Sequence, residues 1–232
     1  MKGSEIMQYP FIQCNSGNYK PGRSSPVKYI VIHYTSNNGD TAKGNAQYFA
    51  RTALRASANY FVDENEIYLS VPEQDTAWHC GTSGTYKHPV CRNTNSLGIE
   101  LCSRKDADEK YYFMDDTVSN ALELTKSLMD KYSVPIENVI RHYDVTGKNC
   151  PAPFVENESK WENFKARLVG GDDEEVAQTR YNTIGEMPSW AQEPIQYLVD
   201  EGLLSKSSTM DLSLDMVRSL VVLSRLAKKC LN

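Results

Sequence analysis

Residues 27–33 of the chain read Val27-Lys28-Tyr29-Ile30-Val31-Ile32-His33. The apolar, β-branched run that ends at His33 is typical of a buried strand. Similar patterns predict strands at residues 57–62, 67–71, 97–102 and 139–140, and helical spacing predicts helices at 41–53, 116–132 and 161–168. Because strands and helices alternate along the chain, the expected fold class is α/β, with a mixed central β-sheet flanked by helices.

A second stretch carries metal-ligand chemistry. Residues 141–151 read Arg141-His142-Tyr143-Asp144-Val145-Thr146-Gly147-Lys148-Asn149-Cys150-Pro151. We expect a loop here that places His142 and Cys150 together, and both side chains suit zinc. A catalytic zinc site needs three protein ligands and one open position, and His33 at its strand end is the candidate for the third. Spacing alone leaves coincidence open, since the chain has four histidines and six cysteines.

Family resemblance adds structural context to this spacing. Five motifs occur in order: Ile30-Val31-Ile32-His33-Tyr34-Thr35, Ala77-Trp78-His79-Cys80-Gly81, Asn95-Ser96-Leu97-Gly98-Ile99-Glu100-Leu101, Arg141-His142 and Gly147-Lys148-Asn149-Cys150-Pro151. Together they resemble the zinc-dependent N-acetylmuramoyl-L-alanine amidases of the type-2 group, which includes phage endolysins, autolysins and the peptidoglycan recognition proteins. The resemblance covers residues 25–168. It implies the same fold, a Zn²⁺ cofactor on His33, His142 and Cys150, and hydrolysis of the amide bond between N-acetylmuramic acid and L-alanine in peptidoglycan.

Two charged residues are candidates for the chemistry itself. Glu100 lies inside an otherwise apolar strand, so alternation directs it away from the face that buries Ile99 and Leu101. It matches the family's catalytic carboxylate, although a solvent-facing strand glutamate would give the same pattern. Lys148 precedes Cys150 by two positions and matches the family's lysine that stabilises the oxyanion. Without the resemblance, a solvated loop lysine would be the ordinary interpretation.

The resemblance also implies residues that bind substrate. We expect His79, Tyr34, Thr35 and Asn95 to line the substrate groove, and we expect Trp78 to pack rather than to contact a ligand. For His79, a loop histidine without a role is the alternative interpretation. The chain departs from the family at Ala58, where several members carry a catalytic tyrosine, so the detailed mechanism at that position stays open.

Composition limits the partners and the compartment. The net charge of the 232-residue chain is −5, which gives no indication of a nucleic-acid partner. We find no apolar segment long enough for a signal peptide or a membrane span, so we expect synthesis in the cytoplasm and holin-type release or phage delivery to the wall. If Cys150 binds metal, five cysteines remain, an odd number that argues against a complete disulfide framework. Pairing of Cys80 with Cys91 stays open.

The last quarter of the chain forms a separate segment. We expect an amidase domain at residues 1–169, an acidic linker at 170–182, and a small helical C-terminal domain at 183–232 with helices at 190–202 and 213–231. The pattern from Trp190 to Leu204 is weakly similar to one S-layer-homology-type repeat. Three roles remain open for it: binding cell-wall polymer, forming a homodimer, or packing on the first domain. For the whole chain, the alternatives to an enzyme are a zinc-containing peptidoglycan-binding protein and a structural zinc module.

Overall fold

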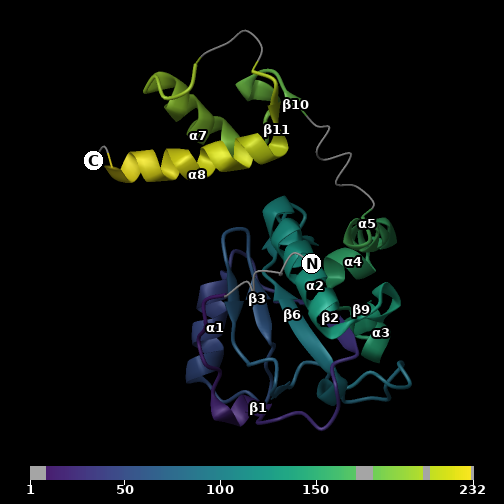
Figure 1. Cartoon of the computed structure of the whole chain (residues 1–232). Helices are drawn as coiled ribbons and strands as arrows, with labels where there is room; N and C mark the ends of the chain where they lie inside the picture. The colour runs from purple at the N-terminus through teal and green to yellow at the C-terminus, as the bar shows by residue number, and fades with distance from the viewer. Residues whose placement is uncertain (1–8, 171–179, 206–209, 231–232) are drawn as a thin grey trace. The chain divides into compact units, whose positions relative to one another are not determined.

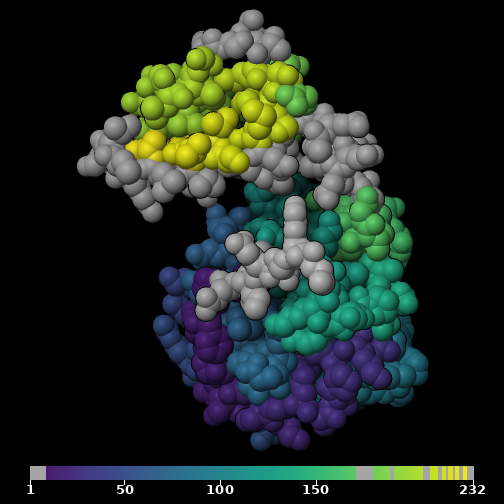
Figure 2. All heavy atoms as spheres, in the orientation of Figure 1, coloured from purple at the N-terminus to yellow at the C-terminus, as the bar shows by residue number. Residues whose placement is uncertain are grey.

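The computed structural model describes residues 9–170, 180–205 and 210–230. The chain divides into two compact units, Met1–Val169 and Gly170–Asn232 (Figure 1; Figure 2). Each unit is described by itself below. No helix in the described ranges is long and apolar enough to cross a membrane.

A five-stranded sheet forms the centre of the first unit. Its strands lie in the order β4 (Ile67–Leu69), β3 (Tyr60–Val62), β6 (Ser96–Leu101), β2 (Tyr29–Tyr34) and β9 (Val139–Arg141). Neighbouring strands are parallel except for β3 and β4, which form an antiparallel hairpin. The predicted class, a mixed sheet flanked by helices, is confirmed.

Alternation along the strands gives the sheet two different faces. Ile30, Ile32, Leu97 and Ile99 are fully buried in a core that also contains side chains of α2 (Asp115–Tyr132) and α5 (Glu158–Leu168). Phe61 points to the opposite face, where its core includes side chains of α1 (Ala42–Arg51). Figure 1 shows these helices around the sheet. His33 and Glu100 follow the same alternation, so they lie on the face away from α2.

Short elements connect this frame. They are η1 (Ser16–Asn18), β1 (Tyr19–Lys20), β5 (Thr76–Ala77), η2 (Asn93–Asn95), β7 (Arg104–Lys105), β8 (Tyr111–Tyr112), η3 (Ile136–Asn138), α3 (His142–Thr146) and α4 (Ala152–Val155). Most of the segment at residues 76–95 is irregular, but β5 pairs antiparallel with β1 at its start.

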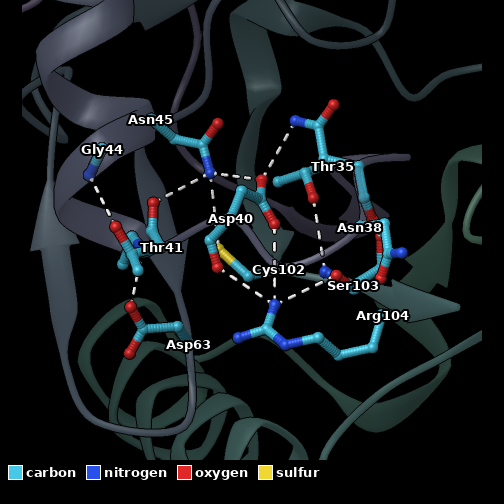
Figure 3. Close-up of polar contacts among 12 residues, drawn as sticks. Thr35, Asn38, Asp40, Thr41, Gly44, Asn45, Asp63, Cys102, Ser103 and Arg104 are labelled. Carbon is cyan, nitrogen blue, oxygen red and sulfur yellow. Dashed lines mark hydrogen bonds and ion pairs between the residues drawn. The ribbon is translucent and has the colours of Figure 1, made fainter.

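Polar side chains hold the segment between β2 and α1 in place (Figure 3). Asp40 accepts a hydrogen bond of 2.7 Å from the Asn45 side chain, and Arg104 donates to the Asp40 carbonyl at 3.0 Å. The backbone N–H of Ser103 donates to the Thr35 hydroxyl at 3.3 Å. These contacts connect the residues that follow His33 to the end of β6. The segment between β2 and α1 therefore has a fixed position.

The second unit has its own small core. It contains β10 (Arg180–Tyr181), η4 (Ile184–Glu186), α7 (Ser189–Asp200), β11 (Leu212–Ser213) and α8 (Leu214–Cys230), and β10 pairs antiparallel with β11. The buried apolar side chains of its described residues are Met187, Ala191, Ile195, Leu198, Leu212, Val217 and Val221. Of the expected linker at 170–182, residues 171–179 lie outside the described residues. Its last part, Arg180–Tyr181, is strand rather than linker.

Candidate functional site

His33 is positioned by the two central strands of the sheet. It is the fifth residue of β2, and the parallel register places it beside Glu100 of β6. The His33 side chain is only 2% exposed, and its Nδ1 lies 4.0 Å from Glu100 Oε1. The C-terminal ends of β2 and β6 therefore present an imidazole and a carboxyl group on the same side of the sheet.

His142 and Cys150 are brought together by a short helix rather than by the loop that the sequence indicated. α3 begins at His142 directly after β9, where Asp144 accepts a hydrogen bond of 2.8 Å from the Arg141 backbone N–H. It ends at Thr146 and is capped by Gly147, whose φ of 82° is the left-handed conformation that glycine adopts without strain. The returning chain is then fixed by a hydrogen bond of 2.8 Å from the Tyr143 N–H to the Cys150 carbonyl.

The three predicted metal ligands meet in one cluster. One donor atom each from His33, His142 and Cys150 lies within 4.8 Å of the others, and all three residues are buried. The distance from Cys150 Sγ to His33 Nδ1 is 3.7 Å. His142 Nε2 and Glu100 Oε2 are both buried, and neither has a hydrogen-bond partner among the described residues. We name these three candidate ligands, together with Glu100, the metal cluster.

The donor set fits a borderline-soft cation. Two imidazole nitrogens and one sulfur are three ligands of the kind that zinc prefers, and no fourth protein ligand joins them in the described part of the chain. Buried polar atoms are rarely left unpaired, so the bare His142 Nε2 is itself an indication that a ligand belongs there. The cluster therefore has the composition of an open site rather than of a closed, structural one.

Burial controls the ionisation of the cluster. It is the largest cause that lowers the pKa of His33 well below its usual value and that of His142 to about 4, with the charge of Lys148 also contributing. Both rings are therefore neutral near pH 7, as metal binding requires. Burial also raises the pKa of Cys150 to about 12 and that of Glu100 to about 8, while Lys148 opposes both shifts.

The metal cluster lies in a cavity of about 340 Å³. Of the other residues predicted for the site, Lys148, His79, Tyr34 and Thr35 line this cavity as well. Asn95 is not among its lining residues: its side chain accepts from the Arg92 N–H at 2.8 Å and donates to the Val90 carbonyl at 3.1 Å. The structure thus uses Asn95 to fold its own loop rather than to reach the groove.

Other lining residues were not foreseen. Phe49, Ser57 and Trp78 form part of the wall, and the half-buried Trp78 faces the cavity instead of only packing. A tryptophan directly before His79 was the one available signal. Ala58 is 1% exposed and belongs to the core beside α1, whereas its neighbours Ala56 and Ser57 line the cavity.

Cys80 and Cys91 are close to one another beneath the site. Both are free, fully buried thiols, and they share an apolar core with Val31. A hydrogen bond between the Cys80 thiol and Cys91, followed by burial, raises the pKa of Cys80 well above its usual value. Both residues therefore pack in the core of the first unit, and Cys80 also lies within hydrogen-bond distance of His79 and Ser96.

Comparison with known proteins assigns the same residues to one family. The family model described as N-acetylmuramoyl-L-alanine amidase matches residues 23–153. N-acetylmuramoyl-L-alanine amidase BlyA of Bacillus subtilis (strain 168) is 35% identical over 162 residues, or 64% of this chain and 43% of BlyA. N-acetylmuramoyl-L-alanine amidase AmiD of Escherichia coli (strain K12) is 31% identical over 159 residues, or 62% of this chain and 54% of AmiD. The chain thus spans about half the length of these curated relatives.

Solved structures give the same assignment for the fold. The structure of PlyL matches with a TM-score of 0.59 and 26% identity, covering 72% of this chain and 99% of that one. The catalytic domain of XlyA matches with a TM-score of 0.56 and 28% identity, covering 70% of this chain and 99% of that one.

Proposed function

The chain belongs to the N-acetylmuramoyl-L-alanine amidase family, and from that premise we propose that its first unit is a zinc-dependent amidase. The reaction is hydrolysis of the amide bond between the lactyl group of N-acetylmuramic acid and L-alanine in bacterial peptidoglycan. His33, His142 and Cys150 hold the metal. When bound, zinc supplies Lewis-acid polarisation of the scissile carbonyl and lowers the pKa of water.

One observation carries this proposal. Three ligand atoms converge at the cavity, and the only carboxyl group in that cavity's lining, Glu100, keeps a buried oxygen without a partner among the described residues. A structural metal site has no need of an unpaired carboxyl group beside it. A binding protein has no need of one either, because an unpaired buried oxygen costs free energy unless it acts on a ligand.

Glu100 is the proton carrier in this proposal. Its pKa of about 8, raised mainly by burial, lies close to the working pH, which is the range where a general base is most effective. The carboxylate takes a proton from the attacking water and delivers it to the leaving nitrogen of L-alanine. A cation brought into the cluster would favour the ionised carboxylate further.

Lys148 is the oxyanion donor. It lines the cavity two residues before Cys150, and its charge acts on Glu100, Cys150 and His142 alike. An ammonium group at this place donates to the carbonyl oxygen as negative charge develops there. Tyr34 and Thr35 form the wall next to it and contact the substrate. The Thr35 hydroxyl oxygen accepts a hydrogen bond from the Ser103 N–H. This bond fixes the Thr35 side chain in an orientation in which it can contact the substrate.

The test is mass spectrometry of purified peptidoglycan after incubation with the full chain. Stem peptides with a free L-alanine amine should appear while the glycan strands stay intact. A chelator should abolish their release, and added zinc should restore it. If zinc binds stoichiometrically but several wall types release no peptide, the chain is a peptidoglycan-binding protein without turnover.

We infer that the second unit is an auxiliary module that binds the cell wall. Every residue of the metal cluster belongs to the first unit, and the second unit has its own small core. Its described surface includes the exposed apolar side chains of Leu203, Met216 and Leu223, which offer contact area for a partner.

Truncation after Val169 tests this second role. The solved catalytic domain of XlyA, 99% of which this chain covers, supports folding of the first unit without the second. We expect the truncated chain to cleave soluble muropeptides at an unchanged rate and to cosediment less with intact walls. Equal cosedimentation would contradict wall binding. If the full chain sediments as a dimer and the truncated chain as a monomer, the second unit is instead a homodimerisation module.

A further inference from the structure

A line of hydrogen bonds leads from the backbone into the metal cluster. Ser96 Oγ lies 2.7 Å from the Arg92 carbonyl oxygen and 3.1 Å from His79 Nε2. On the other side of the same ring, His79 Nδ1 lies 3.0 Å from His33 Nε2. All three side chains are buried, His79 being 7% exposed.

The Arg92 carbonyl sets the direction of this line. A carbonyl can only accept, so the Ser96 hydroxyl donates to it and its oxygen is left to accept from His79 Nε2–H. A neutral imidazole carries one N–H, so His79 Nδ1 must accept, and His33 Nε2–H donates to it. His33 Nδ1 is then the nitrogen without a proton, and it is the one that faces Cys150 Sγ at 3.7 Å.

Cys80 also contacts this line of hydrogen bonds, and its contacts agree with that direction. Cys80 Sγ lies 3.3 Å from His79 Nδ1 and 3.7 Å from Ser96 Oγ. The lone pair of His79 Nδ1 is already used by His33, but the thiol can donate to Ser96 Oγ, which has a second lone pair, and the tautomers of both rings are then unchanged.

The strand beneath His79 is shaped to hold its ring. Ser96, Gly98 and Glu100 alternate on one face of β6. A Cβ atom on Gly98 would lie 2.6 Å from Cγ and 2.8 Å from Nδ1 of His79, distances that real structures do not tolerate. This face therefore supplies a hydroxyl for His79, room for its ring, and the carboxyl group of the metal cluster.

We propose that Ser96, His79 and Gly98 form a positioning relay, which selects the His33 tautomer with a bare Nδ1 and aims that nitrogen at the metal. The metal part of this inference rests on the function proposed above. His79 is then a positioning residue and not a substrate contact, since both of its ring nitrogens are already used. Without the relay, His33 would carry its proton on either nitrogen and would rotate, which weakens metal binding.

The first readout is the tautomer, measured on the full chain without metal. Long-range ¹H–¹⁵N NMR distinguishes the two ring nitrogens, and only four histidines contribute signals. We expect His33 and His79 both to be protonated on Nε2, with His33→Gln and His79→Gln assigning the signals. A His33 signal with the proton on Nδ1 would overturn the proposal. Ser96→Ala should replace the single His79 tautomer by a mixture, and an unchanged His79 signal would also overturn it.

The second readout is zinc affinity, measured by competition with a chromogenic chelator. Loss of an outer partner of a ligating histidine typically weakens metal binding about 10–100-fold. We expect a loss in this range for His79→Phe and Gly98→Ala, and a smaller loss for His79→Gln, whose amide oxygen can still accept from His33. Equal affinities of His79→Phe and the wild type would overturn the relay.

Matched controls separate the relay from general damage. Ser224→Ala removes another buried hydroxyl, in the second unit, and Gly84→Ala adds a Cβ where only a Thr82 hydroxyl oxygen lies within 4 Å, at 3.8 Å. Both should keep wild-type zinc affinity. Thermal unfolding of each metal-free variant identifies any that fail to fold. If the wild-type chain binds no zinc, the proposed function fails, while the tautomer measurement still decides the relay.

Discussion

Glu73 and Glu100 are two carboxyl groups of the same unit, both largely shielded from water, and their pKa values move in opposite directions. Burial would raise the pKa of Glu73, but hydrogen bonds from Lys131, Tyr132 and Tyr60 outweigh it and lower the pKa below its usual value. For Glu100 burial prevails, and the pKa rises to about 8.

The difference lies in what each carboxylate contacts. Glu73 accepts hydrogen bonds from the hydroxyls of Tyr60 and Tyr132 and forms an ion pair of 2.6 Å with Lys131. Glu100 has one oxygen 4.0 Å from His33 Nδ1, and the other has no partner among the described residues. A paired buried carboxylate stabilises the fold, whereas an unpaired one is kept at a cost that function must explain. The comparison predicts different consequences for changes in the two clusters.

The largest effect is expected for Cys150→Ser, which removes a ligand from the metal cluster. A lost outer partner already costs about 10–100-fold in metal affinity or activity, so a lost ligand should exceed that range in both. Zinc content by atomic emission and peptide release from walls should fall together. Unchanged zinc content would show that Cys150 is not a ligand.

Glu100→Gln should lower kcat by about 10²–10⁴-fold, the range of general acid–base catalysis, while zinc content and unfolding temperature stay close to wild type. Glu73→Gln is the matched variant, because it makes the same chemical change in the paired cluster, and its kcat should not change. Both are measured on soluble muropeptides. Full activity of Glu100→Gln would mean that another group is the base, and that catalysis does not explain why Glu100 lacks a partner.

Lys148→Met should lower kcat by about 10²–10³-fold with little change in KM, because an oxyanion donor acts mainly on the transition state. Lys160→Met in α5 removes an exposed lysine outside the cavity lining and should have no effect. A rise in KM at constant kcat would instead assign Lys148 to substrate binding.

The sequence predicts the frame of this site because the frame depends on local patterns. The apolar run before His33 and the isolated acid in Leu97-Gly98-Ile99-Glu100-Leu101 place both residues at a cavity-facing position of a strand. The parallel register that makes them neighbours follows once the two strands pair. The family motifs then identify His142, Lys148 and Cys150, which lie close together in the chain.

The parts that the sequence does not predict depend on approach between distant segments. His79 reads as a groove residue, because nothing in its own loop reveals that its ring lies against Gly98 and between Ser96 and His33. Asn95 also reads as a groove residue, but a local turn directs its amide into its own loop. The helix at His142–Thr146 is only five residues long, too short for periodicity to show, although its end signal, Gly147, is visible.

The Glu73 cluster was not foreseen for the same reason. Its partners come from β3 and from the end of α2, so that Tyr132 is 59 positions away from Glu73 in the chain. No local pattern identifies such a pairing. Its role must therefore be measured through stability rather than inferred from a motif.

Glu73→Gln should destabilise the fold by about 1.5–3 kcal/mol at pH 7, the range for hydrogen bonds to a charged group. Because the pKa of Glu73 is lower in the folded than in the unfolded chain, the carboxylate contributes its stabilisation fully above the unfolded value of about 4.3. That contribution is lost as the pH falls through the lower folded pKa. Urea unfolding at pH 7 and near pH 3 should therefore show a gap between wild type and variant that closes in acid. An equal gap at both pH values would mean that the shape of the side chain, and not its charge, holds β3 to the end of α2.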